Sequence, residues 1–359
     1  MITPAGAILL SADANSSRKR ARDAVAACMP PYPFPCRHVA APMVGCSDLA
    51  FRLLCRRHGA DVAFTEMLFA DRLVSEPGYM CARLKTCAED RPLVVQLAAN
   101  DPAKLAAAAR LVEPMCDAVD LNLGCPLPAA AAVPFGAWLL DRHHWPLVED
   151  MVAAAASAVS IPVWCKIRLL PSLAETTELC RRLEAAGCSL ISVHGRQRPA
   201  DPRACTRDRT SAADLDAIRQ IAAAVGIPVL SNGNTQCHTD VEDNLAHTGA
   251  AGVMCAEGLL RNPLLFEAAA PGDQAPGRRE LGTVALEYLQ LAARYPPPDV
   301  SWVRGHLMWI LGSEGKGHRC RFRNEYLGPY SSAQLLCALQ EAQTMEEFEG
   351  IVGVTLLAP

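Results

Sequence analysis

Metal-binding and disulfide patterns are missing from this chain of 359 residues. None of its 16 cysteines forms a Cys-x-x-Cys pair, and Cys36, Cys46 and Cys55 lack a histidine pair at a ligand spacing, which argues against structural zinc. The cysteines make up less than a twentieth of the chain, below the density of a disulfide scaffold. We therefore predict reduced thiols and no metal site.

Membrane-length apolar runs and excess positive charge are also missing. The uncharged run Met151 to Cys165 is interrupted by serines and a proline, and it is shorter than the roughly 20 residues of a membrane span. The net charge of −4 argues against a generally basic nucleic-acid binder, so a local patch would have to hold any polyanion. The hydrophobic content of 51% allows a large core. We expect a soluble globular protein.

The first residues carry a weak targeting pattern. Met1 to Leu10 is mildly apolar, and Arg18-Lys-Arg-Ala-Arg22 is basic. A nuclear signal, an organelle presequence and a solvated tail all fit this combination, and we favour the tail. The prolines of residues 30–35 forbid a helix, so folded structure should begin near His38. The predicted compartment is the cytoplasm or nucleus, with organelle targeting as the alternative.

From His38 onward, apolar runs typical of strands alternate with helical stretches, which suits parallel β/α units. Helical stretches are expected at 101–112, 173–186 and 212–225. Asp101 and Ser211 mark the start of the first and the third, and Gly187 and Gly226 mark the end of the second and the third. A doubly wound sheet would usually carry a glycine-rich phosphate loop after its first strand, and Ala41-Pro-Met-Val-Gly45 is not one. We therefore predict an α/β fold, a (β/α)8 TIM barrel. Its strands should be 38–42, 61–65, 92–97, 117–122, 162–167, 189–194, 228–231 and 252–255.

Four segments are predicted along the chain. Residues 1–36 should be a poorly ordered tail, and 37–268 the barrel. Residues 269–279, rich in proline and glycine, are typical of a linker. Apolar residues then recur at helical spacing, so 280–359 should form a helical domain. Its helices should cover 281–295, 302–311, 332–343 and 345–352.

Polar residues or glycines end several predicted strands. In a barrel the carboxyl ends of all strands open on one mouth, so Cys125, Lys166 and His194 would become neighbours there. Cys125 stands out because Gly124 and Pro126 should fix a tight turn that presents the thiol instead of packing it. Each residue alone is more often structural, but their convergence predicts a site.

The last strand ends suit a phosphate beside a ring. Backbone N–H groups at Asn232-Gly-Asn234 and Ala256-Glu-Gly258, after the last two strands, would hold the phosphate. Lys166 and His194 would supply positive or donor groups beside the ring, which suits a flavin whose reduced form is anionic.

An ordered set of motifs carries a more specific resemblance. It consists of Ala41-Pro42-Met43, Thr65-Glu66-Met67, Arg91-Pro92-Leu-Val-Val-Gln96, Asp120-Leu-Asn122-Leu-Gly-Cys125-Pro126, Lys166-Ile-Arg168, Val193-His194-Gly195-Arg196, Asn232-Gly-Asn234 and Asn262-Pro263. Over about residues 38 to 350 the chain resembles the tRNA dihydrouridine synthases. Ala256-Glu257-Gly258, Tyr295-Pro-Pro and Arg304-Gly-His306-Leu are most similar to the eukaryotic branch acting on D-loop positions sixteen and seventeen.

The resemblance implies reduction of the uridine C5=C6 bond in the tRNA D-loop, with FMN and NADPH as cofactors. Cys125 would donate a proton to C5 while reduced FMN delivers hydride to C6, and a thiol with a pKa of roughly 8.5 is protonated near neutral pH. The cofactor-binding residues would be Pro42, Met43, Gln96, Asn122, Lys166, His194, Asn232, Gly233, Asn234, Glu257 and Gly258. The substrate-binding residues would be Arg168, Arg196, Arg319, Arg321 and Arg323.

A tRNA substrate must also be bound by a surface outside the barrel mouth, because the target uridine has to be turned out of its stack at a cost of a few kcal/mol. The basic stretch Lys316 to Arg323, around Phe322, offers charge for phosphates and an aromatic ring for stacking. A solvated charged face is the alternative interpretation. We predict tRNA as the partner, while the oligomeric state is not addressed by the sequence.

The resemblance breaks beside the predicted acid. The family usually carries a basic pair and a glycine there, whereas Ala129 to Phe135 is uncharged, and Val133 disfavours positive φ. Two alternatives to an active synthase therefore stay open, a catalytically impaired paralogue that binds RNA or protein and an FMN barrel oxidoreductase acting on a small pyrimidine. Cys125, Lys166 and His194 favour the active enzyme, and the helical domain disfavours a small substrate.

Overall fold

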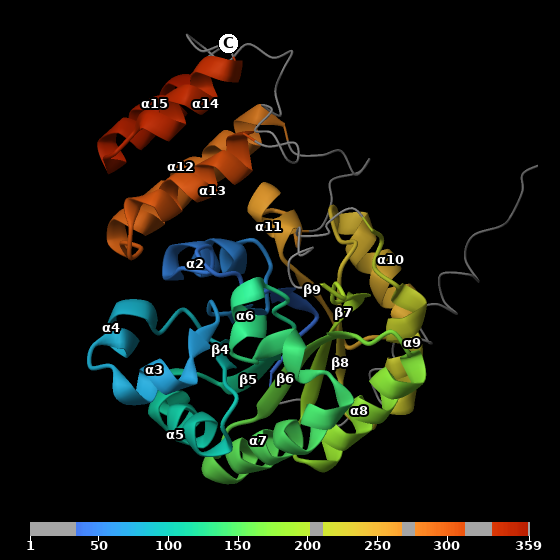
Figure 1. Cartoon of the computed structure of the whole chain (residues 1–359). Coiled ribbons are helices and arrows are strands. Elements are labelled where there is room, and N and C mark those ends of the chain that lie inside the picture. The colour runs from blue at the N-terminus through green and yellow to red at the C-terminus, as the bar shows by residue number, and fades with distance from the viewer. Residues whose placement is uncertain (1–33, 202–210, 268–276, 313–331, 358–359) are drawn as a thin grey trace, which may run out of the picture. The chain divides into compact units, whose positions relative to one another are not determined.

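Figure 1 presents the chain as a computed structural model that describes residues 34–201, 211–267, 277–312 and 332–357. Residues 1–33 of the predicted N-terminal tail, most of the predicted linker and the basic residues from 316 to 323 lie outside these ranges.

The strands close into a parallel barrel. Neighbours around the ring pair in parallel, and β2 pairs with both β1 and β4, which completes the closure. A short extra strand, β3 (Leu68–Phe69), pairs with the end of β4. The predicted (β/α)8 barrel is confirmed, and every predicted strand overlaps an observed one. The barrel strands in the described residues are β1 (His38–Ala40), β2 (Val62–Phe64), β4 (Leu93–Ala98), β5 (Ala118–Leu123), β6 (Val163–Leu169), β7 (Leu190–Gln197), β8 (Val229–Asn232) and β9 (Gly252–Cys255).

Helices connect the strands around the outside of the barrel (Figure 1). Helix α5 (Pro102–Val112) begins as predicted, because the side chain of Asp101 accepts the Lys104 N–H at 2.9 Å. Helix α9 (Leu215–Ala224) begins later than predicted, because its cap is Asp214 and not Ser211. The other helices here are α2 (Leu49–Arg57), α3 (Ala70–Ser75), α4 (Tyr79–Arg83), α6 (Pro128–Ala132), α7 (Trp145–Ala158), α8 (Leu173–Ala185), α10 (His238–Thr248) and α11 (Glu257–Arg261).

The C-terminal part of the described chain is helical, as predicted. Its helices are α12 (Arg278–Arg294), α13 (Val300–Gly312), α14 (Ser332–Glu341) and α15 (Met345–Leu357). Their buried apolar side chains, among them Leu289 and Leu307, share one hydrophobic cluster with Phe51 of α2. A buried hydrogen bond of 2.7 Å between His306 Nε2 and Asp48 Oδ2 joins α13 to the start of α2.

The barrel interior changes from aromatic to polar along its axis. The rings of Phe64 on β2 and Trp164 on β6 meet at 5.8 Å between centroids, although these strands are not neighbours, so both rings point into the barrel. Lys166 and Arg168 follow Trp164 at intervals of two on β6 and therefore share its inward face. The polar side chains thus gather at the carboxyl ends of the strands, where sites of this fold lie.

Candidate active site

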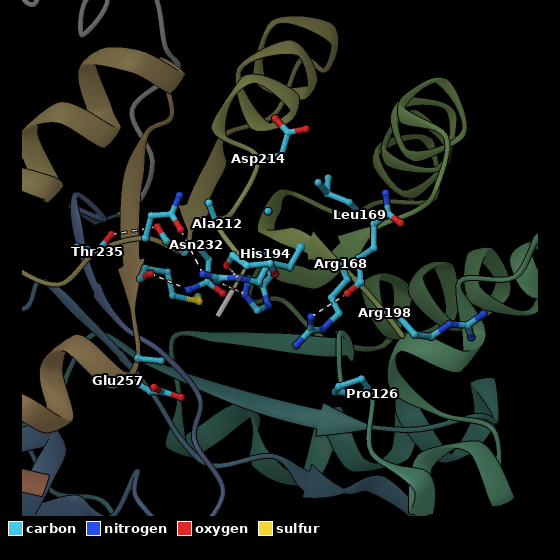
Figure 2. A pocket seen from close by; sticks show the side chains of 18 of the residues that line it. Pro126, Arg168, Leu169, His194, Arg198, Ala212, Asp214, Asn232, Thr235 and Glu257 are labelled. Atoms are coloured by element: carbon cyan, nitrogen blue, oxygen red, sulfur yellow. Dashed lines mark hydrogen bonds between the residues drawn. The ribbon is translucent and has the colours of Figure 1, made fainter. Parts of the chain in front are cut away.

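A cavity of about 860 Å³ opens at the carboxyl ends of β5 to β9 (Figure 2). Of the predicted site residues, it is lined by Cys125, Arg168, His194, Arg196, Asn232, Gly233, Asn234, Glu257 and Gly258. Gln96, Asn122 and Lys166 are not part of this lining but are hydrogen-bonded behind it. Residues from five strand ends, far apart in sequence, therefore share one hollow.

The turn that carries Cys125 is held from two sides. Asn122 Oδ1 accepts the backbone N–H groups of Gly124 at 3.1 Å and Cys125 at 2.9 Å. On the other side, Ala137 N donates to Cys125 O at 3.0 Å. Gly136 has a φ of +61°, and a Cβ there would lie 2.8 Å from Cys125 Cβ. Gly124, which the sequence suggested would shape the turn, has no positive φ, so Asn122 and Gly136 do this instead.

Gln96 and Asn122 are hydrogen-bonded to each other below this turn. Asn122 Nδ2 donates to Gln96 Oε1 at 2.7 Å, and Gln96 Nε2 donates to Asp120 Oδ2 at 2.8 Å. All three side chains are buried. The sequence placed Gln96 and Asn122 at a cofactor, and the structure adds that both belong to the support of the Cys125 turn.

Lys166 is enclosed on most sides by the barrel. Its Nζ donates to Asn232 Oδ1 at 2.9 Å, and Asn232 Nδ2 donates to Met254 O at 2.8 Å. Burial and the charge of Arg168 lower the pKa of Lys166 to about 8, although Asp120 opposes this effect. Lys166 therefore remains mostly cationic at neutral pH while its proton is easier to lose than that of a surface lysine.

His194 is neutral in this surrounding. Burial and the positive charges of Lys166, Arg168 and Arg196 lower its pKa well below the usual value. Arg196 Nη1 lies 3.1 Å from His194 Nε2, and because a guanidinium only donates, Nε2 must accept. The ring proton therefore sits on Nδ1.

Two further arginines border the cavity (Figure 2). Arg168 Nε donates to Gly124 O at 2.9 Å, next to the thiol turn. Arg198, which the sequence analysis missed, pairs with Asp141 at 2.7 Å and stacks over Trp138 at 4.2 Å from the ring centroid. In the sequence, only the position of Arg198 two residues after Arg196 indicates that the two side chains lie on the same side of the chain. The lining thus holds the three cations Arg168, Arg196 and Arg198 and the two carboxylates Asp214 and Glu257, with Lys166 behind it.

The loop after β8 contains two successive residues with positive φ. Gly233 has a φ of +127°, and a Cβ there would lie 2.6 Å from Ala213 Cβ. Asn234 has a φ of 60°, and its side chain accepts from Ala213 N at 2.7 Å and from Arg196 Nη2 at 3.2 Å. Asn234 therefore fixes neighbouring chain segments. Its side-chain groups are used there and are not left for a ligand.

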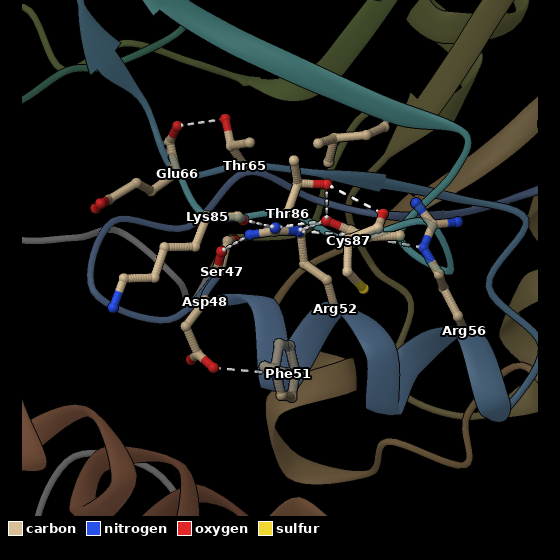
Figure 3. Close-up of polar contacts among 12 residues, drawn as sticks. Ser47, Asp48, Phe51, Arg52, Arg56, Thr65, Glu66, Lys85, Thr86 and Cys87 are labelled. Atoms are coloured by element: carbon tan, nitrogen blue, oxygen red, sulfur yellow. Dashed lines mark hydrogen bonds and ion pairs between the residues drawn. The ribbon is translucent and has the colours of Figure 1, made fainter. Parts of the chain in front are cut away.

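Pro42 and Met43 do not border the cavity among the described residues. Met43 N donates to Ser47 Oγ at 2.9 Å in a turn after β1, and Arg52 Nη1 donates to Ser47 O at 2.7 Å (Figure 3). Arg52 is buried and also bonds the carboxylate of Asp90. The turn after β1 is thus held by several hydrogen bonds. The other predicted substrate-binding residues, Arg319, Arg321 and Arg323, lie outside the described residues.

The uncharged stretch beside Cys125 contains the short helix α6. Val133, at its end, has a φ of −125°, as the sequence predicts for a residue in place of glycine. Its side chain is 62% exposed, and that of Leu127, which lines the cavity, is 40% exposed, so this stretch presents apolar side chains to solvent. Phe135 then packs edge-on against Phe69 at 5.4 Å between ring centroids.

Within the described ranges, no His, Cys, Asp and Glu side chains gather in a group of three or more that would hold a metal ion. None of the helices described is both long and apolar enough to cross a membrane. The described cysteines are all free thiols.

Comparison with known proteins identifies the family. Residues 39–328 match the family model described as dihydrouridine synthase. A mouse protein named tRNA-dihydrouridine(16/17) synthase [NAD(P)(+)]-like is 44% identical over 274 residues, which are 76% of this chain and 54% of that protein. An uncharacterised tRNA-dihydrouridine synthase-like protein of Caenorhabditis elegans is 36% identical, over 80% of this chain and 95% of its own length.

A second mouse relative is named tRNA-dihydrouridine(20a/20b) synthase [NAD(P)+]-like, and it is 40% identical over 64% of this chain and 68% of that protein. The chain spans about half the length of the first mouse relative. The family match nevertheless covers most of the chain, including every motif on which the sequence resemblance was based. The chain therefore belongs to the dihydrouridine synthase family.

Proposed function

We propose that this chain reduces the C5=C6 bond of a uridine in the tRNA D-loop, with FMN as the bound cofactor and NADPH as the reductant. The observation that carries the proposal is the meeting of a thiol and a neutral imidazole, from Cys125 and His194, at one cavity, with the enclosed ammonium group of Lys166 behind the lining residue Asn232. An acid beside a positively charged ring site is what such a reduction needs. The names of the mouse relatives agree with this activity.

The residues present fit FMN. A cavity of about 860 Å³ has room for an isoalloxazine ring and a base, since ligand pockets commonly span about 300 to 1,000 Å³. Lys166 would lie near the ring and favour its anionic reduced form, and His194 would offer the Nδ1 proton. Arg196 and the backbone N–H groups near Gly233 and Gly258 would hold the phosphate. Bound FMN would supply the hydride, which it would first receive from NADPH.

Cys125 would supply the proton. Asn122 and Gly136 fix its turn, so the sulfur keeps one place at the cavity border while the uracil is oriented. Arg168 bonds Gly124 O and borders the same space, where it would contact the base or its phosphate. The thiol would give its proton to C5 and later regain one from solvent.

The D-loop position is a finer proposal. Identity is 44% with the mouse protein named for positions 16/17 and 40% with the one named for 20a/20b, which supports positions sixteen and seventeen. The grip on tRNA is assigned to the arginines at 319, 321 and 323 and to Arg198 at the cavity border.

A specific observation favours a second candidate, the impaired paralogue. The stretch from Ala129 to Pro134 beside the thiol is uncharged and presents Val133 to solvent. If phosphate contacts at this rim are essential, the protein would bind flavin and RNA without turnover.

One experiment separates the two candidates. The purified protein is examined for a yellow chromophore, which is released and identified. The flavin is then reduced by NADPH without oxygen and mixed with an unmodified tRNA transcript. Reoxidation by tRNA, absent in Cys125→Ala, supports the synthase. Reduction without tRNA-dependent reoxidation supports the impaired paralogue, and a colourless protein that takes up no FMN rejects both flavin proposals.

A further inference from the structure

A carboxylate with unused acceptor capacity lies beneath the candidate site. Asp120 on β5 is 1% exposed, and its Oδ1 has no hydrogen-bond partner within the described part of the chain. Burial raises the pKa of Asp120 to about 7, against the opposing effects of the hydrogen bond from Gln96 and the charge of Lys166. Burying a carboxylate costs free energy that an amide of the same shape would not.

A one-way series of hydrogen bonds runs from this carboxylate to the thiol turn. Gln96 donates to Asp120 at 2.8 Å, and Asn122 donates to Gln96 at 2.7 Å. The oxygen of Asn122 is thereby left to accept the N–H groups of Gly124 and Cys125, at 3.1 and 2.9 Å. Each link uses the donor of one residue and the acceptor of the next.

The direction of this series is set at both of its ends. An amide side chain can turn over and exchange its donor for its acceptor, whereas an ionised carboxylate, the form of Asp120 above its pKa of about 7, only accepts, and a backbone N–H only donates. With acceptors at one end and donors at the other, the two amides between them have one satisfied arrangement. If Gln96 and Asn122 both turned over, the Asn122 amide group would face the two N–H donors of the turn, and all would be unpaired.

We propose that Asp120 is a positioning residue whose carboxylate orients the amides of Gln96 and Asn122, so that Asn122 Oδ1 holds the turn bearing the Cys125 thiol. Asp120 does not itself border the cavity. Its carboxylate sets the position of the Cys125 sulfur through the side chains of Gln96 and Asn122. The hydrogen-bond series from Asp120 to the turn does not depend on the reaction, and only the role of Cys125 as the proton donor rests on the proposed function.

A pair of isosteric substitutions tests the direction of the series. Asp120→Asn introduces a group that either donates or accepts, so the carboxylate no longer decides the orientation of Gln96. Gln96→Glu alone places two carboxylates against each other. In the double variant Asp120→Asn/Gln96→Glu, the new amide donates to the new carboxylate, which still accepts from Asn122 Nδ2. The orientation of Asn122 is therefore restored with unchanged net charge.

The matched control is Ser192→Ala. Ser192 lies on β7 opposite Lys166 in the strand register, it is fully buried, and its Oγ has no partner in the described residues. It lies outside the series, so its removal disturbs the barrel interior without altering the direction of any bond in the series.

The measurement is hydrogen exchange of the peptide containing Gly124 and Cys125, followed in the purified protein with and without added FMN. Exchange of these amides should accelerate at least fivefold in Asp120→Asn and in Gln96→Glu, and return to within twofold of the parent in the double variant. Ser192→Ala should match the parent. Stopped-flow reoxidation by tRNA is measured for Asp120→Asn and for the double variant, and it should slow in the single variant and recover in the double variant.

Unchanged exchange in Asp120→Asn would overturn the proposal, as would a double variant no better than the single ones, because packing or charge alone would then explain Asp120. If Asp120→Asn does not fold, the double variant decides, since restored folding and exchange support the series and their absence overturns it. A parent protein that forms no dihydrouridine would reject the proposed function and leave the exchange result intact.

Discussion

Gly136 gives the sharpest test of how the thiol turn is built. Its φ is +61°, and an added Cβ would lie 2.8 Å from both Cβ and O of Cys125. Gly249, which ends α10, has nearly the same φ of +64° but nothing within 4 Å of an added Cβ. The two glycines therefore share the backbone requirement and differ in the contact with Cys125.

The comparison of Gly136→Ala with Gly249→Ala isolates that contact. A left-handed conformation costs an alanine about 1 to 2 kcal/mol, so Gly249→Ala should lower the free energy of unfolding by this amount. Gly136→Ala should lose the same amount and about 1 to 3 kcal/mol more, because the methyl group overpacks the turn. The added methyl group should also displace the turn and the Cys125 sulfur, so reoxidation of the reduced flavin by tRNA should slow at least tenfold.

The assays are urea unfolding of both variants and stopped-flow measurement of the two half-reactions. Reduction by NADPH should be unaffected in both, because neither glycine contacts the Lys166 and His194 side of the cavity. If the two variants matched each other in unfolding free energy and in reoxidation rate, the contact between Gly136 and Cys125 would have no energetic meaning, and the account of the turn would be wrong.

Three further predictions concern the chemistry and the RNA. Cys125→Ala should retain FMN and its reduction by NADPH but be reoxidised by tRNA at least about a hundredfold more slowly, and normal dihydrouridine formation would rule out its role as the acid. Lys166→Ala should weaken flavin retention or slow flavin reduction, so full flavin content with unchanged reduction would remove it from this role. Reversing Arg319, Arg321 and Arg323 to Glu should abolish tRNA binding and spare flavin reduction, and the parent affinity should fall steeply with salt. Unchanged affinity in that variant would place the grip elsewhere.

The barrel was predictable because its signals are local. Each strand is a short apolar run, each run is followed by a helical stretch, and caps such as Asp101 mark where helices begin. The exception is α9, whose cap is Asp214 and not the predicted Ser211. Both residue types accept N–H groups, so composition alone does not decide between them.

The site was predictable only in part, because its support depends on contacts between distant segments. Motifs located Cys125, Lys166 and His194 near one mouth, since all three end strands of one barrel. That Asn122 would hold the thiol turn, or that Gly136 would touch Cys125, follows from hydrogen bonds and close approach that no periodicity encodes.

The charge state of the site is likewise a property of the fold. The pKa of His194 is lowered by burial and by three cations that converge from β6 and β7. Its tautomer depends on Arg196, two residues away, whose guanidinium is also held by Ser211 O at 2.7 Å. A sequence names these residues but not the distances that decide which of them is charged.

The most direct test of the central claim is a single-turnover experiment read by nucleoside mass spectrometry. The protein is loaded with FMN, reduced by NADPH without oxygen, freed of excess reductant and mixed with unmodified tRNA. The account predicts one dihydrouridine formed per reduced flavin, at a D-loop uridine, and almost none with Cys125→Ala. Flavin that stays reduced beside unchanged tRNA, or product that forms equally well without the thiol, would contradict it.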